Sequence, residues 1–108
     1  MDRSSFTMKL KKGFEAEYKF RHDNIWPELL DLLTGDGITE YYIFLDEKTG
    51  ILFAFMKRET SNAKLLIKEH PVMKKWWNYM KDIMDTNPDG SPMTTGLTEV
   101  FALNPTEK

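Results

Sequence analysis

The chain has 108 residues, a formal net charge of −2, two histidines and no cysteine. This length supports one hydrophobic core, so we expect a single domain over residues 1–108. The lack of cysteine excludes disulfides, thiolate metal sites and a cysteine nucleophile. The balanced charge, without a basic cluster, argues against a nucleic-acid partner. No apolar run approaches the roughly 18 residues of a membrane span, and the first ten residues lack the apolar core of a signal peptide.

Four apolar stretches predict β-strands, at residues 6–10, 38–46, 51–57 and 97–103. The second and third are separated by the turn sequence E-K-T-G, which predicts an antiparallel hairpin. Both hairpin strands are apolar on both faces at their centres. A sheet covered by helices on one side only would therefore leave an apolar face, which lines a ligand cavity or packs on a second subunit.

The first helical region is predicted at residues 14–33, with an interruption at Pro27. Proline has no backbone N–H to donate and disfavours a helical residue before it. Asp23 and Asn24 are favourable N-cap residues, so we expect a new helical segment with Pro27 in its first turn. His22 would then lie at or near a break between two helical pieces.

A second helical region is predicted to begin at a cap on Thr60 or Ser61 and to be interrupted at His70. From Pro71 to about Asp85, apolar residues recur at helical spacing. The order strand, helix, strand, strand, helix, strand is the ferredoxin-like α+β arrangement (βαββαβ). It predicts a four-stranded antiparallel sheet with helices on one face.

His22 is the first candidate for chemistry. Tyr18 precedes it by four residues, so the two side chains share one helix face. An imidazole that titrates near neutral pH, beside a tyrosine and a helix break, suits proton transfer. A solvated histidine near a helix end remains the simpler alternative.

Trp76 and Trp77 form an aromatic pair in the second helical region, and Tyr41 and Tyr42 form another in a strand. A stripe of methionine and tryptophan at helical spacing is more often core than binding site. Adjacent helical residues point about 100° apart, so at most one of the two tryptophans lies at the centre of the stripe. An indole at its edge would offer a flat apolar face and one N–H donor, which suits a sugar.

Residues 85–90 resemble the first half of a calcium-binding EF-hand loop. The twelfth position requires a bidentate glutamate, and Gly96 stands there, so we do not expect a metal site. Sequence motifs for zinc peptidases, serine hydrolases and nucleotide-binding loops are also absent.

Five motifs together resemble the L-rhamnose mutarotase family over about Phe6 to Phe101. They are R-H-D-N-I-W-P-E-L, Y-Y-I-F-L-D, K-W-W-N-Y-M-K-D-I-M, N-P-D-G-S-P and L-T-E-V-F, in this order. The resemblance implies a ferredoxin-like, dimeric α/β-barrel fold and a cytoplasmic homodimer that packs sheet on sheet. It also implies an isomerase of rhamnose metabolism that interconverts the α and β anomers of L-rhamnose without a cofactor.

The resemblance further implies roles for individual residues. His22 would be the catalytic proton donor, and the substrate-binding residues would be Tyr18, Tyr41, Trp76 and Trp77. Anomer exchange requires that the ring oxygen gain a proton while the anomeric hydroxyl loses one. The sequence leaves open which group, a residue or a bound water, removes the hydroxyl proton.

Two alternatives remain open at this point. Cofactor-independent monooxygenases and lactone isomerases share the architecture, and the fold alone cannot separate them from a mutarotase. A non-catalytic ligand-binding or dimerisation module would also fit, since such a module could bind a sugar without accelerating anomer exchange.

Overall fold

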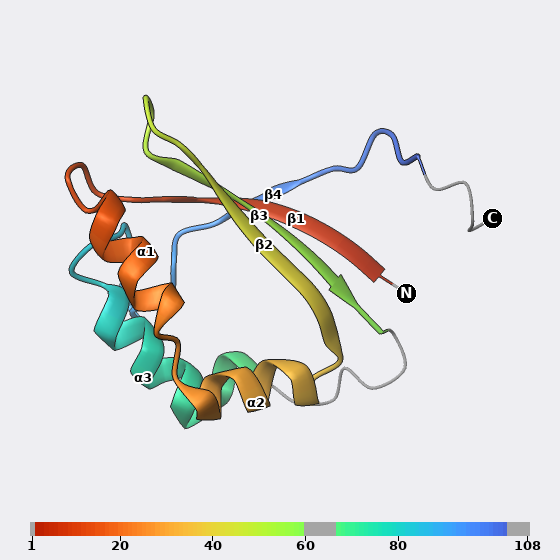
Figure 1. Cartoon of the computed structure of the whole chain (residues 1–108), viewed down its shortest axis with the longest axis horizontal. Coiled ribbons are helices and arrows are strands. Elements are labelled where there is room, and N and C mark those ends of the chain that lie inside the picture. The colour runs from red at the N-terminus through yellow and green to blue at the C-terminus, as the bar shows by residue number, and fades with distance from the viewer. Residues whose placement is uncertain (1, 60–66, 104–108) are drawn as a thin grey trace.

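A computed structural model describes residues 2–59 and 67–103. Within them, β1 (Asp2–Lys9), β2 (Ile38–Asp46), β3 (Ile51–Arg58) and β4 (Thr95–Leu97) form one antiparallel sheet in the order β2-β3-β1-β4. Three helices, α1 (Glu15–Asp23), α2 (Pro27–Gly35) and α3 (Pro71–Met80), lie on one side of it (Figure 1). A short 3-10 helix, η2 (Ile67–Glu69), precedes α3. The expected ferredoxin-like arrangement is confirmed.

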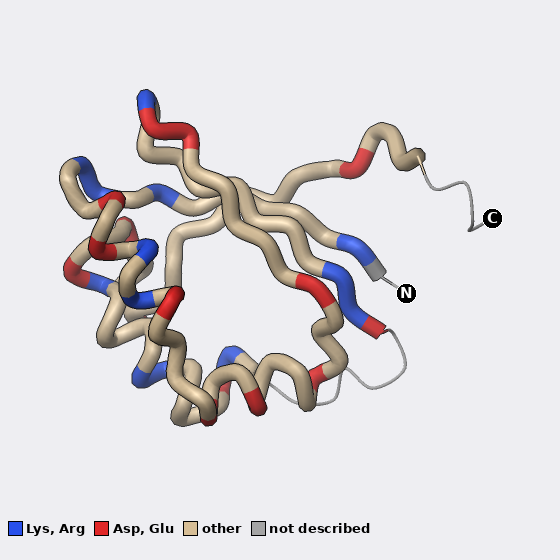
Figure 2. The backbone as a smooth tube through the Cα atoms, in the orientation of Figure 1, with Lys and Arg blue, Asp and Glu red and all other residues tan. Residues whose placement is uncertain are grey.

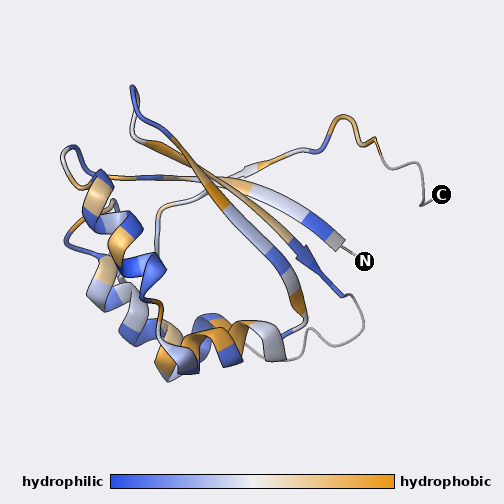
Figure 3. Ribbon diagram, viewed as in Figure 1, coloured by the Kyte–Doolittle hydropathy of each residue, from blue (hydrophilic) through white to orange (hydrophobic). Residues whose placement is uncertain are grey.

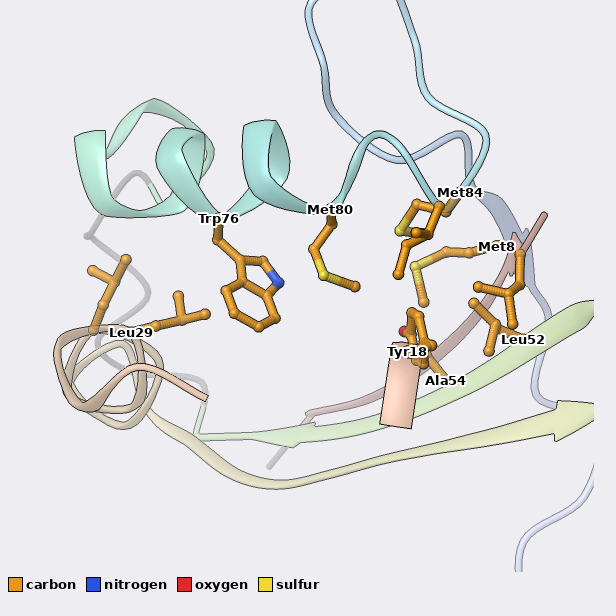
Figure 4. Close-up of a cluster of buried hydrophobic side chains, with 11 residues drawn as sticks. Met8, Tyr18, Leu29, Leu52, Ala54, Trp76, Met80 and Met84 are labelled. Atoms are coloured by element: carbon orange, nitrogen blue, oxygen red, sulfur yellow. The ribbon is translucent and has the colours of Figure 1, made fainter. Parts of the chain in front are cut away.

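The register of the central strands directs apolar side chains to the helices. Ile43 pairs with Ala54 and Leu45 with Leu52, so these residues share the inner face of the sheet. Trp76 and Met80 on α3 point toward this face and meet Met8, Tyr18 and Ala54 (Figure 4). The core therefore lies between the sheet and the helices.

The helix interruption differs in detail from the expectation. α2 begins at Pro27 as predicted, but its N-cap is the extended Trp26, not Asp23 or Asn24. Asn24 instead completes the preceding helix, because its backbone N–H donates to the carbonyl of Phe20 (3.1 Å). Asp23 is the last residue of α1, and its carboxylate accepts from Lys19 (3.1 Å). His22 therefore lies in the last turn of α1.

α3 is shorter than predicted and ends at Met80 instead of about Asp85. The next residues leave the helix because backbone groups near the end of β1 bind them. The N–H of Asp85 donates to the carbonyl of Lys9 (2.9 Å), and Met84 forms a bridge with Leu10. The predicted cap at Thr60 or Ser61 lies outside the described residues.

The last strand is shorter than predicted and begins two residues earlier, so the prediction over residues 97–103 is wrong except at Leu97. Only Thr95–Leu97 pairs with β1, opposite Ser5, Phe6 and Thr7. Residues 98–103 run away from the sheet (Figure 1), with Val100 92% exposed. Val100, Phe101 and Leu103 are largely exposed, and the segment is tied to β1 by a salt bridge from Arg3 to Glu99 (3.0 Å) and not by strand pairing.

The outer face of the sheet is apolar and uncovered by the described residues. Phe44 and Tyr42 of β2 are 68% and 50% exposed, and Phe53 of β3 and Leu97 of β4 are exposed beside them. Charged residues gather toward the strand ends, so the middle of the sheet carries none (Figure 2). The strand centres and residues 100–103 are hydrophobic (Figure 3). The sequence-based expectation of one uncovered apolar face is confirmed for this chain.

The hairpin turn depends on Gly50, which has a positive φ of 77°. A Cβ there would lie 3.0 Å from the carbonyl oxygen of Leu10, whereas at Gly13 (φ 92°) it would meet nothing within 4 Å. Alanine is strained at both positions. We expect Gly50→Ala to lower the free energy of unfolding by about 1–3 kcal/mol more than Gly13→Ala, because of the added overlap. Urea unfolding measures the difference, and equal losses would contradict it.

Candidate active site

His22 projects from the last turn of α1 with a defined orientation. Its Nδ1 bonds to the carbonyl oxygen of Tyr18 (3.0 Å), and its ring stacks on the Tyr18 ring at 4.3 Å. A carbonyl oxygen can only accept, so Nδ1 carries the hydrogen and Nε2 of the neutral ring has a lone pair. Among the described residues, Nε2 has no protein hydrogen-bond partner. It is therefore free to exchange a proton with a ligand.

Aromatic rings from the start of α2 and from α3 surround the imidazole. The edge of His22 meets Trp76 at 5.4 Å and 90°, and Trp76 meets Trp26 at 5.1 Å and 89°. Trp76 is buried and its neighbour Trp77 is half-buried, as helical geometry requires of adjacent residues. These rings fix the imidazole plane through packing.

One cavity, of about 70 Å³ and partly open to solvent, adjoins these rings. All five residues singled out from the sequence line it: Tyr18, His22, Tyr41, Trp76 and Trp77. Tyr41 reaches the cavity from β2, while Tyr42 points to the opposite face of the sheet. The fold thus gathers residues from α1, β2 and α3 that are up to 59 positions apart in the sequence (77 − 18).

The rest of the cavity wall was not predicted. It consists of apolar residues and part of a loop: Met8, Ile43, Met73, Met80, Met84, Thr86, Gly90 and Pro92. The methionine spacing was visible in the sequence but fitted an ordinary core equally well. Thr86, Gly90 and Pro92 carry no local signal that could have assigned them to the cavity.

The loop at residues 86–92 is closed by its own hydrogen bonds. The N–H of Asn87 donates to the carbonyl of Ser91 (2.7 Å), and the Asp89 carboxylate accepts from the N–H of Ser91 (2.9 Å). Asp89 is thus engaged within the loop. The described residues contain no group of three or more His, Cys, Asp or Glu that could hold a metal ion.

Burial shapes the electrostatics of the cavity. It lowers the pKa of His22 below its usual 6.5, against the opposing effects of the Tyr18 carbonyl and Asp23. Burial also raises the pKa of Tyr18, with Tyr41 raising it further, and raises the pKa of Tyr41 to about 12. At neutral pH, the imidazole is therefore neutral and both phenols keep their protons.

The described lining residues include three titratable groups: His22, Tyr18 and Tyr41. Because the phenols stay protonated, they can donate hydrogen bonds but are poor bases. The imidazole alone has a pKa that suits proton transfer near neutrality. Flat aromatic walls, phenol donors and one imidazole form a site that suits a ring carrying several hydroxyl groups.

The helices of the described residues are all too short or too polar to cross a membrane. This is the one finding that bears on the expectation of no membrane segment.

Comparisons with known proteins agree with the resemblance. A family model described as L-rhamnose mutarotase matches residues 3–103. An L-rhamnose mutarotase of Flavobacterium johnsoniae is 58% identical over 102 residues, which cover 94% of this chain and 95% of that protein. The crystal structure of an L-rhamnose mutarotase from Formosa agariphila is 46% identical, with a TM-score of 0.90. That match covers 96% of this chain and all of the other.

A second solved structure, a candidate antibiotic biosynthesis monooxygenase from Deinococcus radiodurans, has a TM-score of 0.55 at 15% identity. The match covers 99% of this chain and all of the other, and it shows a shared fold alone. The family model instead covers residues 3–103, a range that contains all the cavity residues. The chain belongs to the L-rhamnose mutarotase family.

Proposed function

We propose that this chain is an isomerase of rhamnose metabolism that interconverts the α and β anomers of L-rhamnose. Membership of the family supports the substrate and the reaction. The observation that carries the chemistry is the free Nε2 of His22 beside an aromatic cavity, with Nδ1 held by the Tyr18 carbonyl. This arrangement supplies a proton acceptor at the place where the ring of a sugar can stack.

In the proposed mechanism, His22 makes both proton transfers. Nε2 accepts the proton of the anomeric hydroxyl as the bond between C1 and the ring oxygen breaks, and the resulting imidazolium returns it to the ring oxygen. The open aldehyde turns about its C1–C2 bond, and the reverse transfers close the ring on the other face. Both oxygens are bonded to C1, so one imidazole can serve them in turn.

This mechanism answers the question of the second acid–base group without another titratable residue. Tyr18 and Tyr41 keep their protons and would donate hydrogen bonds to sugar oxygens. Trp76 and Trp77 would stack on the ring and limit access of water. The five residues thus divide into one catalytic group, His22, and four substrate-binding groups.

Two other functions suit the architecture less well. A cofactor-independent monooxygenase is supported by fold likeness alone, and oxygen uptake with an aromatic substrate would favour it. A binding module would accept the sugar without accelerating exchange. Family membership favours catalysis over binding alone, because the matched family and its relatives are named as mutarotases.

We further propose that the chain is a single domain and works as a cytoplasmic homodimer. The uncovered face carries Tyr42, Phe44 and Phe53 on neighbouring strands and Leu97 at its far edge, and exposed apolar side chains of this kind favour association in water. A two-fold axis would pack this face on its copy. The exposed residues 98–103 could then cover part of the partner's sheet. The cytoplasmic location follows from the family resemblance.

Replacement of the imidazole tests the proposed chemistry. We expect His22→Ala to slow exchange between the anomeric protons of L-rhamnose by about 100-fold or more, since it removes the general acid–base group. Saturation-transfer NMR at anomeric equilibrium measures this rate. His70→Asn is the matched control, because asparagine can also cap α3 and His70 lies outside the cavity. Equal rates for wild type and His22→Ala would remove His22 from the mechanism, and an inert, folded wild type would favour a binding module.

The pH dependence tests the order of the proton transfers. If neutral His22 acts as the base, activity is lost as the pH falls through its folded-state pKa, which burial lowers below 6.5. We expect the rate to rise with pH, to inflect below 6.5 and to stay level through pH 9. Because the pKa of His22 is lower in the folded than in the unfolded chain, the unfolded chain takes up the proton at a higher pH. The free energy of unfolding therefore falls as the pH drops below about 6.5. Circular dichroism at each pH separates loss of activity from unfolding. An exchange rate that decreases as the pH rises from 6 to 8 would contradict the base role.

The outer face of the sheet provides the test of the dimer. We expect wild type to run at twice the monomer mass of 12.7 kDa and Phe44→Glu to run as a monomer, because a buried carboxylate would be unpaired. Phe20→Glu is the control, since Phe20 is 60% exposed on α1 and away from this face. Light scattering after size-exclusion chromatography measures the masses. A monomeric wild type would refute the homodimer.

A further inference from the structure

Arg21, the residue before His22, is a buried cation that the proposed chemistry does not use. Its side chain is 9% exposed although it lies on a helix at the surface of the chain. Nε donates to Glu17 (2.7 Å) on the preceding turn of α1. A buried charge is costly unless it is fully paired, so its other contacts are informative.

The remaining contacts of Arg21 cross to the end of α3. Nη1 donates to the carbonyl oxygen of Tyr79 (2.7 Å), and the guanidinium meets the Asp82 carboxylate through Nη1 (2.9 Å) and Nη2 (3.3 Å). The Tyr79 carbonyl is one of those left without a partner at a helix C-terminus, where positive charge is favourable. Arg21 therefore caps α3 from α1.

The guanidinium also begins a chain of aromatic contacts that returns to the site. Its carbon lies 4.4 Å from the centre of the Tyr79 ring, and Tyr79 stacks on Trp26 at 5.6 Å. Trp26 meets Trp76, and Trp76 meets His22. Since His22 is bonded to Arg21 through the backbone, these contacts form a closed loop between α1 and α3.

We propose that Arg21 is a positioning residue, which holds α1 against α3 and thereby sets the spacing between the His22 imidazole and the Trp76 indole. Its effect on activity rests on the proposed mutarotase function. The planar guanidinium is required because it binds three acceptors at once, one in α1 and two at the end of α3. A lysine would keep the charge but could not reach all three in fixed directions.

The test compares Arg21→Met and Arg21→Lys with Arg58→Met. Arg58 is the matched control because it forms the ion pair with the buried Asp36 (2.9 Å), outside the cavity. Both methionine variants remove a cation from an ion pair in which one partner is buried, and both should lose stability. Each is assayed at a temperature at which melting curves show it to be folded. The measurements are kcat and KM for anomer exchange, and the nuclear Overhauser effect between the His22 and Trp76 rings.

We expect Arg21→Met to lower kcat about 10- to 100-fold, because small misplacements of a catalytic group are costly. The ring-to-ring Overhauser effect should weaken, and KM should change by less than about threefold, since the lining residues remain. Arg21→Lys should recover part of the loss. Arg58→Met should keep kcat within about twofold and retain the Overhauser effect, because distant sites act independently. Equal losses of kcat in the two methionine variants, or none in Arg21→Met, would overturn the proposal.

A third variant keeps the test decisive if Arg21→Met does not fold. Asp82→Asn weakens the contact of Arg21 with the end of α3, and it does so at an exposed position, since the Asp82 side chain is 63% exposed. We expect a loss of kcat of about threefold to tenfold, because a hydrogen bond to a charged group is weakened. Unchanged kcat in both Asp82→Asn and Arg21→Lys would overturn the proposal. An inert wild type would refute the mutarotase function alone, because the Overhauser effect tests the positioning without substrate.

Discussion

The contact between α1 and α3 is the constraint on which the rest of the site depends. The two helices lie side by side below the sheet (Figure 1), and large side chains fill the space between them. Arg21 of α1 joins them at one end through two acceptors, the Tyr79 carbonyl and the Asp82 carboxylate. The rings of Tyr18, His22 and Trp76 join them next to the cavity. Both sets of contacts include adjacent residues, Arg21 and His22. The packing of the two helices and the orientation of the imidazole therefore depend on each other.

The two faces of the sheet have different tasks. The inner face carries Leu52 and Ala54 into the core and Tyr41 into the cavity. The outer face carries Tyr42, Phe44 and Phe53, which the described residues leave open. Strand alternation makes this division unavoidable, because consecutive residues point to opposite sides. Between Tyr41 and Leu45, a substitution on β2 is therefore expected to affect the site at odd positions and the assembly at even positions, whereas the register shift between Ile38 and Glu40 breaks this alternation nearer the start of the strand.

The chemistry follows from the low polarity of the cavity. Burial lowers the pKa of His22 and raises those of Tyr18 and Tyr41, so the difference in pKa between the imidazole and the phenols increases. The imidazole is left as the group that can give and take a proton near neutral pH. The Tyr18 carbonyl fixes its tautomer, which directs the basic nitrogen away from the helix.

Much of this protein was predictable from local rules. Alternation and turn chemistry located the hairpin, helical spacing located the helices, and their order predicted the sheet topology. The helix break at Pro27 was predicted because proline lacks a donor, although its cap is Trp26. The candidates Tyr18, His22, Tyr41, Trp76 and Trp77 came from spacing and from motifs.

Contacts between residues far apart in the sequence decided the features that local sequence patterns could not predict. The early end of α3 depends on hydrogen bonds to the distant Lys9 and Lys11 backbone, and the extent of β4 is set by its pairing with the distant residues Ser5, Phe6 and Thr7. Thr86, Gly90 and Pro92 join the cavity only because their loop folds back over the sheet. The link from Arg21 to the end of α3 has no local signal in the sequence, since these two acceptors lie 58 and 61 residues away. The sequence by itself determined most of the elements, because they depend on near neighbours, and its motifs indicated the candidate site residues. The tertiary structure decided their spacing and electrostatics, because burial and long-range contacts exist only once the chain has folded.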